Sequence, residues 1–259
     1  STRWTGAIPG FALNFQSPRL VLAGEAVEFE WRPAGSPAGR RREFVARNRF
    51  GLWRWQCSEI SDESGNPGFR IEFARDSQNT SAPVADWELT LFTMDELPCD
   101  HLLAQGSSMG NCLSLETGHH REREFRGYAQ LLLRRERQFL QLAMAPETPG
   151  DAFFSGTVTH GCLHHLAANV REVIARNAAF PAISLEIFSG PDCHALMDNY
   201  ARRHAGRHPL RPPRDSGCGW NSWDYYRWTI TAEEVLANAE FIARDPVLSQ
   251  HVKRIVIDD

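Results

Sequence analysis

Alternating apolar and polar positions dominate the first 190 residues. Phe69, Ile71 and Phe73 alternate with Arg70 and Glu72, and a period of two places one set of side chains on a single face of a strand. Other runs repeat this alternation, with apolar positions at Val27, Phe29 and Trp31, at Trp87, Leu89 and Leu91, at Leu140, Leu142 and Met144, and at Ile183, Leu185 and Ile187. Turn-forming residues at 33–39, 61–68 and 146–150 separate the runs. Many short strands divided by turns predict a large antiparallel β-sandwich over residues 1–190.

The pattern changes near residue 191. Residues 191–205 have helical spacing, with Leu196 and Tyr200 on one side. The proline-rich segment 206–214 is expected to be extended, because the residue before a proline avoids the helical region. We therefore predict a helix and linker over residues 191–216.

Residues 217–259 read as a β-α-β unit. A short apolar run at 217–223 predicts a strand, and a helix is predicted over 231–244. Thr231 and Glu234 have the spacing of a capping box, in which the two side chains satisfy the first backbone amides of that helix. The run 252–257 predicts a second strand that is apolar enough to be buried on both faces, as parallel strands are.

Composition and charge are those of an ordinary globular chain. Hydrophobic residues make up 42% and charged residues 23%, which excludes wholesale disorder, a collagen-like sequence and a coiled coil. The net charge of −4 and the pI of about 6.2 give no indication of a nucleic-acid partner. No run of residues resembles a membrane span, and the first residues lack the apolar core of a signal peptide. The sequence does not decide the cellular compartment of the protein, and the cytoplasm is slightly favoured.

Cysteine and histidine spacing gives no metal or redox motif. The chain has no C-x-x-C, which excludes a zinc ribbon and a thioredoxin-type motif. We expect free, mostly buried thiols, with a disulfide left open if the protein is exported, and the sequon at Asn79 does not decide that question. The histidines fit no strong zinc pattern and are predicted to be structural or superficial: His119, His120, His160, His164 and His165. Neither a metal nor a cofactor is expected.

Two motifs that are typical of known enzyme classes are absent from the sequence. The segment 107–110 is flanked by glycine but lacks the G-x-S-x-G nucleophile elbow, and the chain has no phosphate-binding glycine loop. The sequence therefore shows neither a hydrolase triad of that type nor a nucleotide site.

The segment 219–228 is crowded with aromatic residues that are interleaved with Asn221, Ser222, Asp224 and Arg227. Apolar ring faces beside hydrogen-bonding groups suit a sugar, because a pyranose presents C–H groups on one face and hydroxyls at its edge. The alternative is that these rings are core residues at a domain interface, and for Trp220 this is the favoured interpretation.

Asp258 and Asp259 follow directly after an apolar strand. In parallel α/β architectures ligands bind at the carboxyl ends of strands, and sugar hydroxyls can satisfy both carboxylates by donating hydrogen bonds. The alternative is a solvated chain end.

Together, Gly-Trp-Asn-Ser-Trp-Asp at 219–224, the capped helix and Ile-Val-Ile-Asp-Asp at 255–259 resemble the opening of the catalytic barrel in glycoside hydrolase family 36, the melibiase-type α-galactosidases. The resemblance spans residues 217–259 and implies a β-supersandwich followed by the start of a (β/α)8 barrel. It also implies that Trp223 forms an apolar wall of the galactose subsite. Asp258 and Asp259 match the pair that hydrogen-bonds the galactose C4 and C6 hydroxyls.

The resemblance makes the chain the N-terminal part of a retaining α-galactosidase-like enzyme. The nucleophile and the acid/base are expected beyond residue 259, so no catalytic residue is assigned and these 259 residues alone are expected to be inactive. The substrate would be an α-galactoside or related oligosaccharide, and a homo-oligomer of the intact enzyme is possible. Alternatives are an α-N-acetylgalactosaminidase, a raffinose-synthase-like transferase, and a non-catalytic sandwich that binds carbohydrate or mediates assembly.

Overall fold

The computed structural model describes residues 2–34, 40–76, 86–105, 112–148, 150–172, 180–205 and 218–258. The chain divides into two compact units, residues 1–208 and 209–259. The proline-rich segment 206–214 lies outside the described residues, and the boundaries 1–190, 191–216 and 217–259 stay a prediction.

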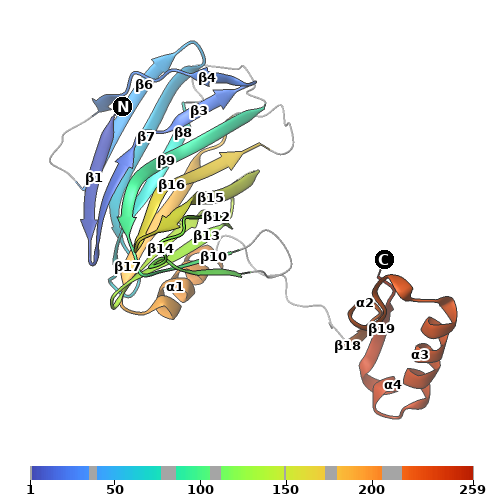
Figure 1. Ribbon diagram of the computed structural model, residues 1–259. Coiled ribbons are helices and arrows are strands. Elements are labelled where there is room, and N and C mark those ends of the chain that lie inside the picture. Colours follow the sequence, from blue (N-terminus) through green and yellow to red (C-terminus); the bar gives the residue numbers. More distant parts are fainter. Residues whose placement is uncertain are drawn as a thin grey trace. The chain divides into compact units, whose positions relative to one another are not determined.

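The first unit is mainly antiparallel β-structure, as the alternation predicts (Figure 1). Over the described residues, one sheet has eight strands: six follow the order β1-β2-β9-β16-β15-β12, β3 pairs with β9, and β4 pairs with β3. Its members are β1 (Arg3–Ile8), β2 (Phe11–Gln16), β3 (Arg19–Leu22), β4 (Glu25–Val27), β9 (Trp87–Pro98), β12 (Arg123–Tyr128), β15 (Asp151–Thr159) and β16 (Cys162–Arg171).

The second sheet has nine strands among the described residues, in the order β11-β10-β13-β14-β17-β8-β7-β6-β5. Its members are β5 (Arg32–Ala34), β6 (Arg41–Asn48), β7 (Gly51–Ser61), β8 (Pro67–Arg75), β10 (His101–Gln105), β11 (Cys112–Glu116), β13 (Gln130–Arg135), β14 (Gln138–Met144) and β17 (Ile183–Gly190). Every pairing within it is antiparallel.

The core lies between the two sheets. Phe15 and Phe92 from the first sheet and Ile71 and Leu140 from the second belong to one continuous buried cluster. The alternating apolar positions of β8, β9, β14 and β17 are all buried, which confirms the predicted faces. Each large side chain withdrawn from water in this way contributes about 1.5–3 kcal/mol. The sandwich therefore holds itself together without any cross-link among the described residues.

One predicted strand is wrong. Residues 28–31 form no ladder, although Phe29 and Trp31 pack against the core with ring centroids 4.8 Å apart. The reason is topological, since β4 belongs to the first sheet and β5 to the second. The segment between them crosses from one sheet to the other and keeps its buried rings without strand partners.

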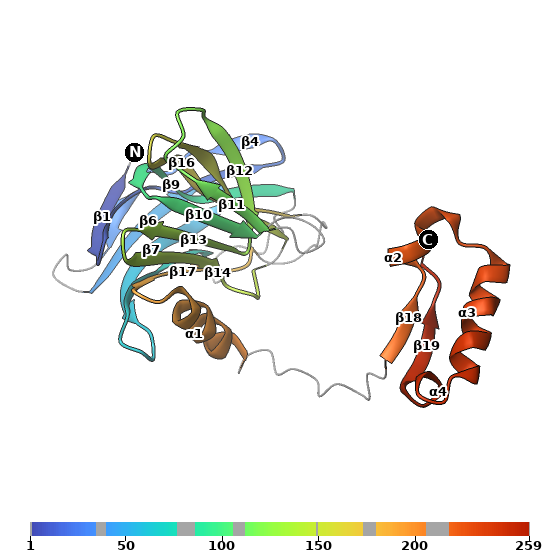
Figure 2. The same cartoon turned by 60° about the horizontal axis from the view of Figure 1, so that its bottom comes forward.

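Helix α1 (Cys193–Ala205) follows the last strand of the sandwich, where the sequence predicts a helix. It lies against β14 and β17 on the outer side of the second sheet (Figure 2). Leu196 and Tyr200 are buried in this contact, as their spacing predicts.

The second unit is a β-α-β arrangement with additional short helices. It contains β18 (Cys218–Asn221), α2 (Trp223–Tyr226), a 3-10 turn (Arg227–Thr229), α3 (Ala232–Arg244), α4 (Leu248–His251) and β19 (Val252–Val256). β18 and β19 are parallel, which confirms the prediction of a helix between two parallel strands. The capping box is also present: Thr231 Oγ accepts from the amide of Glu234 at 3.3 Å, and Glu234 Oε2 accepts from the amide of Thr231 at 2.9 Å.

Among the described residues, the apolar last strand lacks the partners that would bury both of its faces. Ile255, Val256 and Ile257 are 41%, 44% and 62% exposed. Among the described residues β19 pairs with β18 alone. A parallel strand buries both faces only when strands flank it and helices cover it on each side.

Candidate functional site

The candidate site lies where β18 and β19 end. Because the two strands are parallel, their carboxyl ends meet at the same edge, and the chain leaves β18 through Asn221 and Ser222 and leaves β19 toward Asp258. Asn221 pairs with Val256 in the ladder, so the residues that follow each strand start from neighbouring positions. The edge therefore brings the aromatic segment 219–228 close to the acidic end of the described chain.

Ser222 joins the two strand ends. Its side chain is fully buried, and its amide donates to the carbonyl of Val256 at 3.1 Å. Its hydroxyl accepts from the amide of Asp258 at 3.0 Å and donates to the carbonyl of Asp258 at 3.4 Å. A hydroxyl can serve as donor and acceptor at once, so one small side chain satisfies both backbone groups of Asp258.

Asn221 links the two residues that the sequence singles out. Its Oδ1 accepts from the amide of Trp223 at 2.7 Å, and its Nδ2 lies 3.5 Å from Oδ2 of Asp258. The first contact is a normal hydrogen bond, and the second is at the outer limit for one. One amide side chain thus contacts the backbone that carries Trp223 and the carboxylate of Asp258.

The aromatic residues of this segment contact one another. The rings of Trp223 and Trp228 meet edge to face at 4.8 Å, and those of Tyr225 and Tyr226 do so at 4.9 Å. Trp223 is half-buried, whereas Tyr225 and Trp228 are 86% and 72% exposed. Edge-to-face pairs fix ring orientation, so this edge presents a partly ordered apolar surface next to a carboxylate.

Trp223 lies in a helix and not, as the sequence predicts, at the end of a strand. The strand predicted over 217–223 ends at Asn221, and Trp223 begins the short helix α2. The change comes at Ser222, whose backbone is helical with φ −76° and ψ −26°. Asp258 is half-buried just after β19, and Asp259 lies outside the described residues.

The sequence analysis named Asn221 and Ser222 only as hydrogen-bonding groups among the aromatic residues, and it did not predict that they make the contacts between the two strand ends. The available signal was weak, because small polar residues at a strand-to-helix junction are common. Their partners are set by strand pairing across 36 residues, which the local sequence does not reveal.

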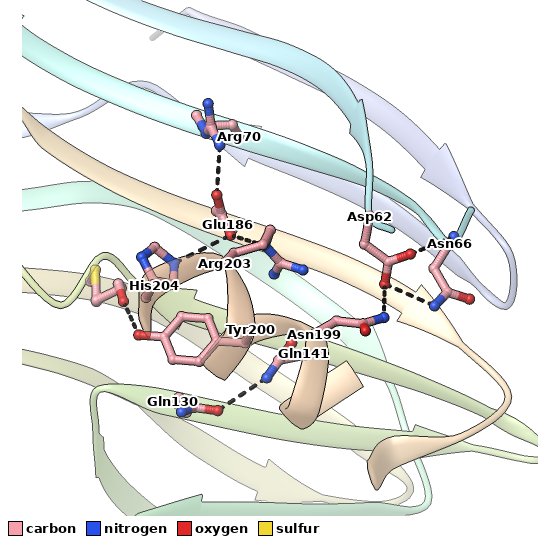
Figure 3. Close-up of polar contacts among 11 residues, drawn as sticks. Asp62, Asn66, Arg70, Gln130, Gln141, Glu186, Asn199, Tyr200, Arg203 and His204 are labelled. Atoms are coloured by element: carbon pink, nitrogen blue, oxygen red, sulfur yellow. Dashed lines mark hydrogen bonds and ion pairs between the residues drawn. The ribbon is translucent and has the colours of Figure 1, made fainter. Parts of the chain in front are cut away.

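A second polar cluster lies between α1 and the sandwich and was not predicted (Figure 3). Glu186 of β17 is buried, and its carboxylate contacts Arg70 at 2.7 Å, Arg203 at 3.0 Å and His204 at 3.6 Å. The guanidinium of Arg203 also lies 4.2 Å from the centroid of the Phe188 ring. The alternation in β17 marks Glu186 as facing away from the core but does not indicate that a helix covers it.

Asp62 forms the other half of this cluster. Its carboxylate accepts from Asn66 Nδ2 at 2.9 Å and from Asn199 Nδ2 of α1 at 2.8 Å, and it also accepts from the amides of Ser64 and Asn66. Tyr200 donates its hydroxyl to the carbonyl of Met144 at 2.7 Å. The polar side of α1 is therefore hydrogen-bonded to the sandwich at several points along its length.

Both buried carboxylates are held in the charged form. Burial by itself would raise the pKa of Glu186, but the hydrogen bond from Arg70 and the charges of Arg203, Arg70 and His204 outweigh it and hold the pKa below its usual value. Burial would likewise raise the pKa of Asp62, and the hydrogen bonds from Asn66, Asn199 and Ser64 lower it below the usual value. Such a cluster is an anchor rather than a proton-transfer site, because neither group titrates near neutral pH.

The remaining candidates lie on the sandwich. His120 and His160 have ring centroids 5.1 Å apart, and His164 lies 3.7 Å from Glu96. Within the described ranges no three His, Cys, Asp or Glu side chains are arranged to hold a metal ion. The segment 107–110 and the sequon at Asn79 lie outside the described residues.

The six cysteines are free and differ in exposure. The expectation of mostly buried thiols is wrong, since only Cys57 and Cys99 are buried among the described cysteines, whereas Cys112 and Cys218 are exposed. Cys112 begins β11, an edge strand of the second sheet, and Cys218 begins β18, one of the two paired strands of the second unit. No helix in the described part of the chain has the length and apolar character needed to cross a membrane.

Comparison with known proteins gives matches at the level of structure. No protein-family model and no curated protein sequence matches the chain. The α-N-acetylgalactosaminidase NagBb from Bifidobacterium bifidum, in its GalNAc complex, aligns with 80% of this chain at a TM-score of 0.53 and 8% identity. The Gal-NHAc-DNJ complex of the same enzyme aligns with 80% at a TM-score of 0.50 and 11% identity. The chain spans only 36% and 39% of those two chains. The likeness shows that this chain has a glycoside hydrolase-like fold.

Proposed function

We propose that the chain is the N-terminal part of a retaining α-galactosidase-like glycoside hydrolase, and that the edge formed by β18 and β19 holds a terminal α-galactosyl residue. The observation that carries the proposal is that Asn221 contacts both the amide of Trp223 and the carboxylate of Asp258. An aromatic ring and a carboxylate held at one strand edge match the two kinds of surface that a pyranose presents.

The roles follow the resemblance of residues 217–259 to glycoside hydrolase family 36. Trp223 would pack against the apolar face of the sugar, and Asp258 and Asp259 would accept hydrogen bonds from its C4 and C6 hydroxyls. Hydrogen bonds to a charged acceptor contribute about 1.5–3 kcal/mol each. Such groups select the sugar and do not themselves break the glycosidic bond.

The bond-breaking carboxylates would belong to a longer chain. A retaining glycosidase places its nucleophile and its acid/base about 5–5.5 Å apart on either side of the scissile bond. Asp258 and Asp259 are neighbours at the end of one strand and cannot flank a bond in this way. The proposal of a longer parent is consistent with the 36% share of NagBb that the chain spans.

An α-N-acetylgalactosaminide is the second candidate substrate, and the similarity to NagBb favours it. It would use the same Trp223 and Asp258, with the acetamido group accommodated elsewhere. A transferase related to raffinose synthases would share this sugar subsite and differ only in the acceptor.

The test is ligand binding and turnover with the 259-residue chain. Isothermal titration with methyl α-galactoside, methyl α-N-acetylgalactosaminide and methyl α-glucoside should show binding of the first or second and weaker binding of the third. An activated aryl α-galactoside should not be hydrolysed. Turnover that disappears in Asp258→Ala would contradict the proposal that the reacting carboxylates lie elsewhere. Sugar binding that survives both Trp223→Ala and Asp258→Asn would instead indicate a carbohydrate-binding sandwich.

A further inference from the structure

The hydrogen-bond ladder between β18 and β19 continues one step past the end of β18. In a parallel pair, every second residue of a strand donates to the residue before its partner and accepts from the residue after it. Asn221 pairs with Val256, so the next residue, Ser222, should donate to Val256 and accept from Asp258. The amide of Ser222 does donate to the carbonyl of Val256 at 3.1 Å.

The second bond of this step is made by the side chain. The backbone of Ser222 has turned to φ −76° and ψ −26°, the helical region, because α2 begins at the next residue. The amide of Asp258 donates to the hydroxyl of Ser222 at 3.0 Å. The hydroxyl therefore takes the place that the backbone carbonyl of a continuing strand would occupy.

Because a hydroxyl takes the place of the carbonyl, the structure combines two features that a regular strand could not combine. The chain turns into α2 in time to place Trp223 at the strand edge, and the backbone that carries Asp258 still has a partner across the ladder. Ser222 is fully buried, so its hydroxyl bonds the backbone of Asp258 rather than bulk water.

We propose that Ser222 is a positioning residue that fixes the backbone of Asp258, and through it the direction of the Asp258 carboxylate, for sugar binding. The role of Ser222 in sugar binding rests on the proposed function, whereas its role in fixing the backbone of Asp258 does not. Ser222 itself is not expected to touch the sugar, because its hydroxyl is occupied by both backbone groups of Asp258.

The experiment is amide hydrogen exchange measured by NMR on the whole 259-residue chain, with and without methyl α-galactoside. In Ser222→Ala, the exchange protection of the Asp258 amide should fall about tenfold, the change that one lost hydrogen bond produces. The amide of Asp245, which donates to Phe241 at the end of α3, is the internal reference and should not change. The dissociation constant for methyl α-galactoside should rise by a similar factor.

Two further variants make the result decisive. Ser222→Thr keeps the hydroxyl and should restore Asp258 protection, and Ser249→Ala, an exposed serine on α4, should change nothing. Unchanged protection of Asp258 in Ser222→Ala would overturn the proposal. Equal loss at Asp258 and Asp245 would also overturn it, because Ser222 would then support the whole unit.

The outcomes for Ser222 and for the proposed function can be told apart. If the unsubstituted chain binds none of the three methyl glycosides, the proposed function fails. The exchange of the Asp258 amide would still decide whether Ser222 holds this backbone.

Discussion

Arg203 of α1 points its Nε–H at Oε2 of Glu186 on β17, 3.0 Å away, and only 5% of the glutamate side chain is exposed. This ion pair ties the last helix of the first unit to the outer face of the second sheet. Arg70 approaches the other carboxylate oxygen from β8, so one carboxylate joins three elements. The contact holds the C-terminal end of α1 against the sandwich.

Removing the charge of Glu186 should destabilise the first unit. In Glu186→Gln, Arg70 and Arg203 would lose their anion in a buried site, which typically costs about 3–5 kcal/mol. Urea unfolding followed by circular dichroism measures the change in free energy. The matched control is Glu240→Gln, because Glu240 pairs with Arg244 on an exposed helix face and should cost less than about 1 kcal/mol. Equal effects of the two substitutions would contradict the anchoring role of Glu186.

Stability should fall in acid. Folding lowers the pKa values of Glu186 and Asp62 below their ordinary ones. At a pH between the folded and unfolded pKa values of a group, the unfolded chain therefore binds more protons than the folded chain. In that range the free energy of unfolding rises with pH. Their contribution is present above the unfolded values, about 4.3 for Glu and 3.9 for Asp, and is lost as the pH falls through the folded values. Urea unfolding between about pH 5 and 3 should give a smaller pH slope for Glu186→Gln than for the unsubstituted chain. Identical slopes would show that Glu186 does not contribute to this transition.

The capping box should stabilise α3 locally. Thr231→Ala removes the side chain that accepts from the amide of Glu234, and losing such a cap costs about 1 kcal/mol. Amide exchange in the first turn of α3 should become faster, while amides of the sandwich strands stay unchanged. Thr229→Ala is a suitable control, since its hydroxyl bonds the carbonyl of Tyr226 outside α3. Slower or unchanged exchange in Thr231→Ala would contradict the prediction.

Substitutions at the candidate sugar site should affect affinity and selectivity differently. Asp258→Asn removes a charged acceptor and should weaken binding of methyl α-galactoside by about 1.5–3 kcal/mol, and Asp259→Asn should act similarly. Trp223→Ala should weaken binding without altering its pH dependence, because an indole ring does not titrate. Titration calorimetry measures both effects. If Asp258→Asn weakened galactoside and glucoside binding equally, Asp258 would not read the axial C4 hydroxyl.

Much of the fold can be predicted from local sequence. Phe69, Ile71 and Phe73 alternate with charged residues, and a strand in a two-layer sandwich needs that pattern because its successive side chains face opposite sides. Thr231 and Glu234 mark the start of α3 because a capping box involves residues only three positions apart. The aromatic segment 219–228 and Asp258 are indicated by the chemistry of their own segments, Trp223 itself is indicated by the family resemblance, and the parallel pairing of β18 and β19 brings the two segments to one edge.

Tertiary structure decided what depends on partners distant in sequence. Phe29 and Trp31 alternate like a strand, but the chain crosses between sheets there and no ladder forms. Glu186 looks like an exposed strand position, yet Arg70, 116 residues away, and α1 enclose it. Ser222 has no distinguishing local pattern, and its contact with Asp258 exists only because β18 and β19 pair in parallel. Local sequence determines backbone preference and side-chain periodicity, which are short-range properties. The partner of a buried polar group is determined by chain topology, and no window of neighbouring residues contains that information.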